Sequence, residues 1–177
     1  MKIAALGITA AVIAIAVSGC AAAETADSTL SLADTKGSAQ LMRNTISGQI
    51  SPEITAAVTD VTDASETCNS DSKSLMRLWR STARTELTPD AASKVYTIQE
   101  TIAGSYVSKG WTSESEKLSD SSTIVTLTNP SSLAVIAITA TDDGDGVGTG
   151  ATLFVNIAGP CVKTDGPGSA ELQQLGE

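Results

Sequence analysis

The chain has 177 residues, with 20 acidic and 11 basic side chains, a formal net charge of −9, three cysteines and no histidine. The absence of histidine excludes Ser-His-Asp and Cys-His catalytic pairs as well as histidine-ligated metals. The acidic balance argues against a nucleic-acid-binding protein, because such proteins contact phosphates through a basic surface.

The N-terminus has the features of a secretory signal peptide. Lys2 precedes an uncharged run over residues 3–17, which is too short to span a bilayer core, since that takes about 20 apolar residues. The run leads into Val17-Ser18-Gly19-Cys20, which resembles the lipobox of bacterial lipoproteins. The resemblance implies that residues 1–19 are removed and that the Cys20 thiol carries a diacylglycerol. An ordinary signal peptide with an accidental cysteine is the alternative.

Lipid on Cys20 would make the membrane the first partner of the mature protein, because two or three acyl chains anchor a protein firmly. Residues 20–31 are then the lipidated cysteine and a flexible tether of small and polar residues. Lys2 is the only charged residue of the leader, so the net charge changes from −9 to −10 on processing.

Two helices are expected after the tether. The first covers residues 35–47 and ends at Gly48, a residue type favoured after a last helical turn. The second begins with Ser51 as N-cap and Pro52 in its first turn. Its buried stripe would follow the i, i+3, i+4, i+7 pattern, with Ile54, Ala57, Val58 and Val61.

A strand and a longer helix follow. Residues 74–87 alternate with period 2, which predicts a strand with one apolar and one polar face. Thr88 as N-cap, Pro89 in the first turn and Gly110 beyond the last turn predict a helix over residues 89–109. The side of this helix that should pack on the sheet carries Ala91, Val95, Ile98, Ile102 and Tyr106.

The remainder is predicted to be β-structure. Residues 111–118 are expected to form an edge strand, in which the acidic side chains Glu114 and Glu116 discourage edge-to-edge pairing. Further strands are expected over residues 122–128, 133–141 and 151–157, the last with Leu153, Val155 and Ile157 facing the core. A Gly/Asp-rich loop over residues 142–150 joins the last two strands, and residues 163–177 are expected to be a disordered tail.

This order of elements predicts one α+β domain over residues 32–162. It should have two layers, an antiparallel sheet of four to five strands and helices packed on one face. Export would place Cys68 and Cys161 in an oxidising compartment, where two thiols usually form a disulfide. The bridge would tie the N-terminal helical part to the final strand. A redox or metal-binding pair is the alternative, but CxxC spacing and histidine are both missing.

Four features together resemble small cell-envelope lipoproteins of actinobacteria, the mycobacterial Lpp/Lpq type included. They are the lipobox ending at Cys20, the link from Cys68 into a strand, the helix end Lys109-Gly110-Trp111 and the closing Gly159-Pro160-Cys161. The resemblance implies a location, the extracytoplasmic face of the cell membrane. Members that look like this are mostly uncharacterised, so it carries over no catalytic residues.

Three groups of charged residues are candidate sites. Asp142-Asp143-Gly144-Asp145-Gly146 suggests calcium, but an EF-hand loop starting at Asp143 would have Val147 and Phe154 at ligand positions, so a hairpin loop explains it better. Arg80 and Arg84, with Arg77 near them, could bind an anion or pair with local acids. Glu114 and Glu116 on one edge strand do not face each other as hydrolytic carboxylates do.

The five aromatic residues are expected to be mostly core, because a domain with so few has little to place on a binding surface. They are Trp79, Tyr96, Tyr106, Trp111 and Phe154. Trp111 should pack back on the sheet after the helix end. Phe154 lies either under the helices or on an exposed contact surface, and the sequence leaves both open.

We therefore expect a non-enzymatic, lipid-anchored envelope protein that acts as an interaction or structural module. No catalytic residue, cofactor or metal ligand is predicted, and the expected partners are the membrane and an envelope protein or lipid. The alternative is an extracytoplasmic carrier that binds a lipid or small apolar ligand between helix layer and sheet, which needs a cavity of about 300 Å³ or more. An enzyme, with convergent acids in a cleft, is the third possibility.

Overall fold

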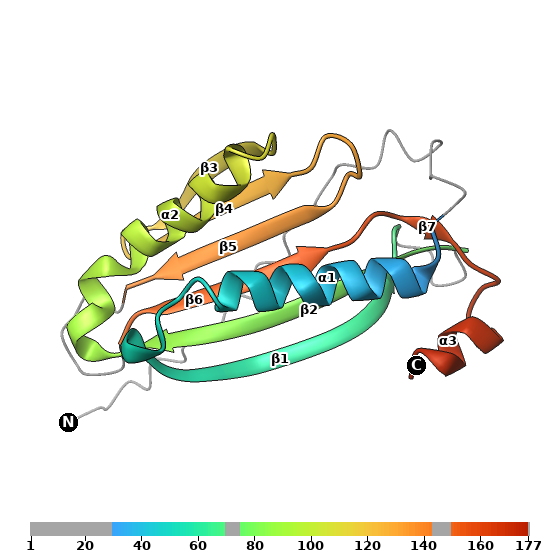
Figure 1. Cartoon of the computed structure of the whole chain (residues 1–177), viewed down its shortest axis with the longest axis horizontal. Coiled ribbons are helices and arrows are strands. Elements are labelled where there is room, and N and C mark those ends of the chain that lie inside the picture. Colours follow the sequence, from blue (N-terminus) through green and yellow to red (C-terminus); the bar gives the residue numbers. More distant parts are fainter. Residues whose placement is uncertain (1–29, 70–74, 143–149, 177) are drawn as a thin grey trace, which may run out of the picture.

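The computed structural model describes residues 30–69, 75–142 and 150–176 of the chain. The strands form one sheet, and the helices lie against it (Figure 1). The helical elements are α1 (Leu32–Ser47), η1 (Pro52–Ile54), η2 (Pro89–Lys94), α2 (Val95–Val107) and α3 (Ala170–Gln174). The strands are β1 (Thr55–Thr67), β2 (Met76–Leu87), β3 (Thr112–Ser119), β4 (Ser122–Thr128), β5 (Val135–Thr141), β6 (Thr152–Ala158) and β7 (Val162–Lys163).

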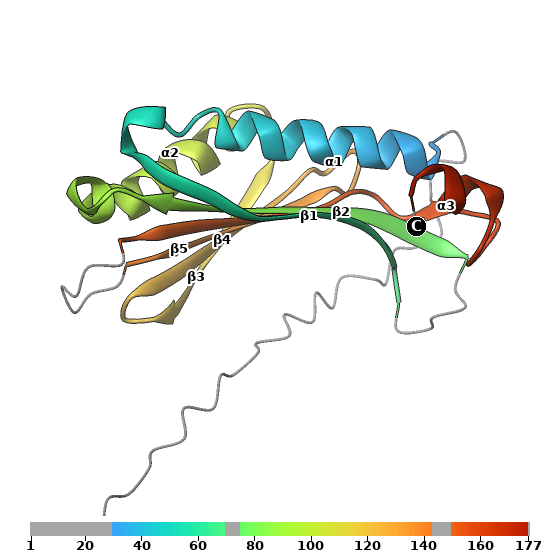
Figure 2. The ribbon, with the colours of Figure 1, turned by 90° about the horizontal axis from the view of Figure 1, so that it is seen from below.

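The expected α+β class and the antiparallel sheet are confirmed, but the predicted number of strands is wrong. Six strands lie in the order β1-β2-β6-β5-β4-β3, and the short β7 also pairs with β2. All pairs are antiparallel. Helices α1 and α2 lie side by side on one face of the sheet, α1 over β2 and α2 over β4 and β5 (Figures 1 and 2).

The long strand that the sequence did not predict is β1, which forms where a helix was expected. The helix start is real for one turn, since the Ser51 side chain accepts a hydrogen bond from the Glu53 N–H, but only the 3-10 turn η1 forms. Six of the 13 residues of β1 are β-branched, which favours a strand, and β2 pairs with them along their length. The apolar spacing from Ile54 to Val61 was therefore a chance match to the helical period.

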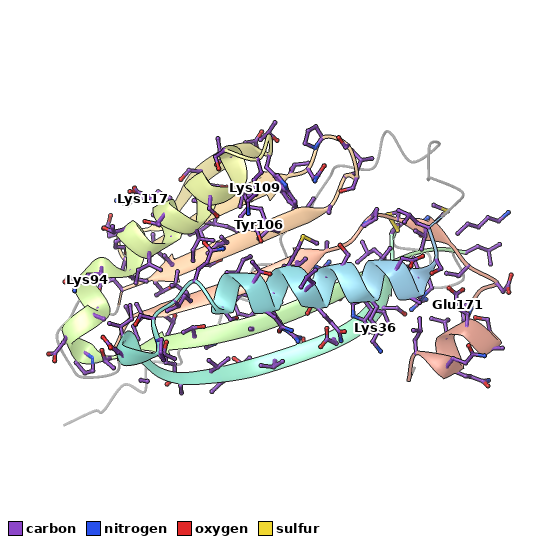
Figure 3. All side chains as sticks on the ribbon, in the orientation of Figure 1. Lys36, Lys94, Tyr106, Lys109, Lys117 and Glu171 are labelled. Carbon is purple, nitrogen blue, oxygen red and sulfur yellow. A yellow bond between two sulfur atoms is a disulfide. The ribbon has the colours of Figure 1, made fainter. Side chains whose placement is uncertain are left out.

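The segment expected to be a disordered tail contains ordered structure. Residues 162 and 163 add β7 to β2, and α3 follows with Leu172 only 4 % exposed. The Leu32 N–H donates to a Glu171 carboxylate oxygen at 3.1 Å, and Lys36 Nζ donates to the Leu175 carbonyl oxygen at 3.0 Å. Lys36 and Glu171 accordingly lie where α1 meets the C-terminal segment (Figure 3). A buried leucine and these two bonds explain why this segment does not leave the domain.

The core lies between the helices and the sheet, as predicted. Val95, Ile102 and Tyr106 of α2 are buried, as are Leu153 and Ile157 of β6. Trp111 packs against this core, with its ring centroid 5.1 Å from that of Tyr106 in an edge-to-face arrangement. The predicted orientation of α2, of β6 and of Trp111 is thus confirmed.

The edges of the sheet are β1 and β3. The edge position predicted for β3 is confirmed, and its side chains Glu114, Glu116 and Lys117 are exposed. In β1 the register shifts between Thr59 and Thr62, and Asp60 adopts a positive φ of 50° there. Charged side chains and an irregular backbone discourage further strands from pairing at an edge. Both edges of the sheet are therefore poorly suited to pairing with a further strand.

Candidate functional site

One face of the sheet carries no helix in the described part of the chain. Both α1 and α2 lie on the opposite side (Figure 2). Along β5 and β6 every second side chain is buried and the others are partly exposed, which is the pattern of strands covered on one face. We call the uncovered side the open face.

The register of the strands assembles the open face into rows that cross the sheet. One row runs through Thr62, Thr82, Asn156, Ala137 and Thr126 to Glu114. The next runs through Thr59, Arg84, Phe154, Thr139 and Ile124 to Glu116. Each row therefore has uncharged residues at its centre and an acidic residue on β3.

The centre of the open face is uncharged. Strands β4, β5 and β6 have seven residues each and carry no charged side chain on either face. We call their outward side chains the neutral strip: Ser122, Ile124, Thr126, Thr128, Val135, Ala137, Thr139, Thr141, Thr152, Phe154, Asn156 and Ala158. In a chain of net charge −9, this strip shares the depletion of charged residues that is found at interface centres.

Phe154 is the large aromatic side chain of the neutral strip. Of the two positions that the sequence left open for it, under the helices or on an exposed surface, the structure has the second. It lies on the open face, half-buried, with the Arg84 guanidinium 5.3 Å from its ring centroid. Its cross-strand neighbours are Arg84 on β2 and Thr139 on β5. Ile124 in the same row is 5 % exposed, yet it is not part of the core cluster under the helices.

The arginines that were candidates for an anion site have protein partners. Arg84 Nε lies 2.7 Å from the Asp60 carboxylate, and Arg80 Nε lies 2.7 Å from that of Glu66. Arg80 also donates to the Asn156 side-chain oxygen at 2.7 Å. Arg77 donates to the Ser65 hydroxyl on β1. Arg80 and Arg84 thus pair with local acids along one border of the open face, which matches the alternative to an anion site.

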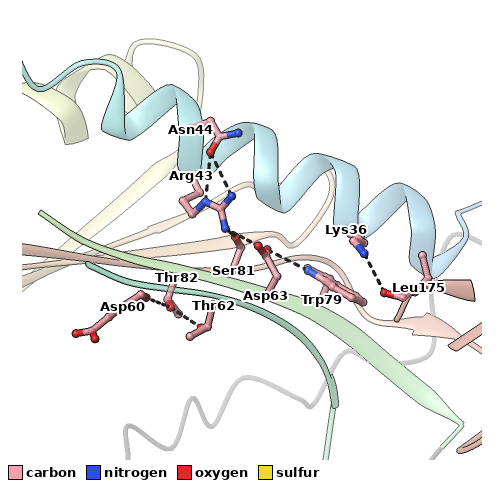
Figure 4. A network of polar contacts seen from close by, with 10 residues as sticks. All are labelled: Lys36, Arg43, Asn44, Asp60, Thr62, Asp63, Trp79, Ser81, Thr82 and Leu175. Carbon is pink, nitrogen blue, oxygen red and sulfur yellow. Dashed lines mark hydrogen bonds and ion pairs between the residues drawn. The ribbon is translucent and has the colours of Figure 1, made fainter. Parts of the chain in front are cut away.

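On the helix side of the sheet, a polar network ties α1 to β1 and β2 (Figure 4). Arg43 Nη1 lies 2.6 Å from Asp63 Oδ2 and donates to Ser81 Oγ at 3.0 Å. The other Asp63 oxygen accepts from the Trp79 indole N–H at 3.4 Å. Burial raises the pKa of Asp63, but the hydrogen bonds from Arg43, Ser81 and Trp79 outweigh it, so that the pKa is lowered overall. This network has no local signal in the sequence, because its members are far apart in the chain.

Gln99 fixes the other helix to the sheet. Its side chain is 2 % exposed, and its amide nitrogen donates to the carbonyl oxygens of Ile138 at 2.6 Å and Thr123 at 3.2 Å. The Thr123 hydroxyl donates to its amide oxygen at 2.8 Å. A buried glutamine whose amide is satisfied in this way positions α2 over β4 and β5.

An open groove of about 400 Å³ lies along α2. It is lined by Gln49, Lys94, Thr97, Ile98, Thr101 and Ile102. No strand residue contributes to the lining, and Gln49 belongs to the connection between α1 and η1. The groove therefore lies between α2 and this connection, and it is not the cavity between helices and sheet that a carrier was expected to have.

The disulfide predicted between Cys68 and Cys161 is present, with the two Cα atoms 6.1 Å apart. It joins the end of β1 to the segment between β6 and β7. Cys20 and residues 143–149 of the Gly/Asp-rich loop lie outside the described residues. Within those residues, no three His, Cys, Asp or Glu side chains converge as metal ligands would. The described helices include none that is both long and apolar enough to cross a bilayer.

Comparison with protein-family models, with curated proteins and with solved structures gives no match for this chain. Its own geometry therefore carries the functional argument. The neutral strip offers hydroxyls, an amide and apolar groups on one broad surface, but it contains no acid or base. Such a surface is suited to binding by contact rather than to proton transfer.

Proposed function

We propose that this chain is a lipid-anchored interaction module of the cell envelope, which binds a protein partner through the open face of its sheet. The observation that carries the proposal is the neutral strip, where three adjacent strands lack charge on the side that no described helix covers. Charge depletion with a central aromatic residue, here Phe154, is typical of interface centres.

The location rests on the N-terminal sequence. The lipobox-like Val17-Ser18-Gly19-Cys20 and the apolar run before it support export and lipidation of Cys20. The segment from Cys20 to Ser31 would then tether the domain to the extracytoplasmic face of the membrane. Acyl chains on Cys20 would hold the module at a two-dimensional surface, where partners are concentrated and weak contacts are sufficient.

The experiment is site-specific photo-cross-linking in cells. A photoreactive phenylalanine analogue replaces Phe154 in the full-length chain, and the matched control carries it in place of Leu41, which is 66 % exposed on the outer side of α1. We expect discrete protein adducts from position 154 and none from position 41. Equal adduct patterns from both positions, or none from position 154, would contradict the proposed interaction surface.

The carrier alternative has one observation in its favour, the groove along α2 with Ile98 and Ile102 in its lining. Its volume of about 400 Å³ is within the range of small-molecule sites. A carrier would retain lipid after purification from membranes, and Ile98→Trp would displace it by filling the groove. Lipid retention that Ile98→Trp abolishes would favour the carrier.

A further inference from the structure

We infer that the partner of the open face is a second copy of this chain, stacked sheet against sheet about a two-fold axis parallel to the strands between β5 and β6. The inference rests on the proposed function, because it names the partner of the same surface. Three properties of the open face carry it: its shape, its charge distribution and its area.

Phe154 on β6 and the small side chains of β5 are complementary in shape. The axis runs midway between these neighbouring strands, so it lays β6 of one copy over β5 of the other. The outward residues of β5 are Val135, Ala137, Thr139 and Thr141. Phe154, the only large aromatic side chain of the neutral strip, thus faces the small outward side chains along β5 of the other copy. The two-fold axis makes this contact twice, once from each copy. Two-fold interfaces need this kind of self-complementarity.

The two borders of the open face differ in their charged side chains. The same axis places β2 of one copy over β4 of the other and β1 over its β3. Asp60 and Glu66 of β1 thus lie across from Glu114 and Glu116 of the other copy, and the arginines of β2 lie beside both sets of acids. Arg80 and Arg84 on β2 then come within reach of Glu114 and Glu116 on the partner's β3, which form no ion pair with the described residues of their own chain. The ion pairs of Arg84 and Arg80 use only the Nε donor of each guanidinium, which leaves N–H groups for a second carboxylate.

The area is that of a stable interface. Six strands spaced about 4.8 Å apart, each contributing about seven residues of about 3.4 Å, give a face of roughly 700 Å². Specific interfaces bury about 800 Å² on each partner. Since charged side chains and a register shift disfavour pairing at the edges β1 and β3, stacking of the open faces is the favoured way for two copies to associate.

The test is co-capture of two differently tagged full-length chains that are expressed together and extracted from membranes with detergent. Ala137→Arg puts a charge at the centre of the neutral strip, where the Ala137 side chain is partly exposed, so we expect the substitution to cost little stability. Thr45→Arg on the exposed side of α1 is the matched control. Co-capture caused by shared micelles would be equal in wild type and in both variants.

We expect the second copy to be captured with wild type and with Thr45→Arg, and at least tenfold less with Ala137→Arg in both chains. No co-capture in wild type, or equal co-capture in all three, would overturn the inference of a second copy. If Phe154 cross-links to a different protein while wild type shows no co-capture, the interaction surface stands and the second copy is wrong. If Phe154 forms no adduct at all, both fail.

Discussion

Replacing Gln99 by glutamate places a carboxylate where α2 meets the sheet, and the structure predicts a destabilisation that grows with pH. In wild type the amide nitrogen donates to the carbonyl oxygens of Ile138 and Thr123. An ionised carboxylate cannot donate to them, whereas a protonated carboxyl group can donate one bond and still accept from the Thr123 hydroxyl. Gln99→Glu should therefore be close to wild type when protonated and much less stable when ionised.

The magnitude follows from the burial of this side chain, which is 2 % exposed. Burial at such a site raises a glutamate pKa in the folded state by about two to three pH units above its unfolded value of about 4.3. Because the folded pKa is the higher one, the variant loses stability relative to wild type as pH rises from about 4. The loss reaches about 3–4 kcal/mol at pH 7.5, at 1.36 kcal/mol per pH unit.

Urea denaturation of the full-length chain, followed by tryptophan fluorescence at pH 4 and pH 7.5, measures this difference. The matched control is Gln49→Glu, because Gln49 is exposed and should change stability little at either pH. If Gln99→Glu kept the stability of wild type at pH 7.5, Gln99 would not hold α2 to the sheet in the way described.

Three further predictions concern the disulfide, the α1 network and the anchor. Cys68→Ser with Cys161→Ser should lower the free energy of unfolding by up to about 4–5 kcal/mol, since the bridge spans 93 residues; an unchanged urea midpoint would contradict this. Asp63→Asn should destabilise the fold at pH 7 but progressively less below about pH 4, because a carboxylate whose pKa is lowered in the folded state stabilises the fold only above its unfolded pKa. A difference in unfolding free energy between variant and wild type that stayed constant from pH 3 to pH 7 would rule this out. Asp60→Asn is the control and should matter less, because the Asp60–Arg84 pair is more exposed. Cys20→Ala should move the protein from the membrane fraction to the soluble fraction, and unchanged membrane retention would refute lipidation at Cys20.

Local patterns in the sequence predicted those elements whose own residues determine them. The alternation in β2 and the apolar stripe of α2 follow from one face being buried, and each is visible within a short window. The helix predicted from Ser51 failed because its apolar spacing fits two structures, and pairing with the distant strand β2 decided for β1. The periodicity within one segment carries no information about pairing with a distant strand.

The candidate site was only partly accessible from the sequence. The sequence left Phe154 either in the core or on a contact surface. Which of these holds depends on the face of β6 that the helices cover, and contacts between distant elements determine that face. The uncharged stretch over β4, β5 and β6 was visible in the sequence and could have been noticed, because strands with one solvated face usually carry charges on it. The Arg43–Asp63 pair and Gln99 had no local signal at all.

The most direct test of the account is whether the open face is covered while the protein is on the membrane. Thr139→Cys places a thiol in the neutral strip, and Thr45→Cys places one on the exposed side of α1. Their labelling rates with a membrane-impermeant maleimide are compared in intact membranes and after dilution into detergent. The account predicts slow labelling at position 139 in membranes, faster labelling after dilution, and fast labelling at position 45 throughout. Equally fast labelling of both positions in intact membranes would contradict the claim that the open face binds a partner.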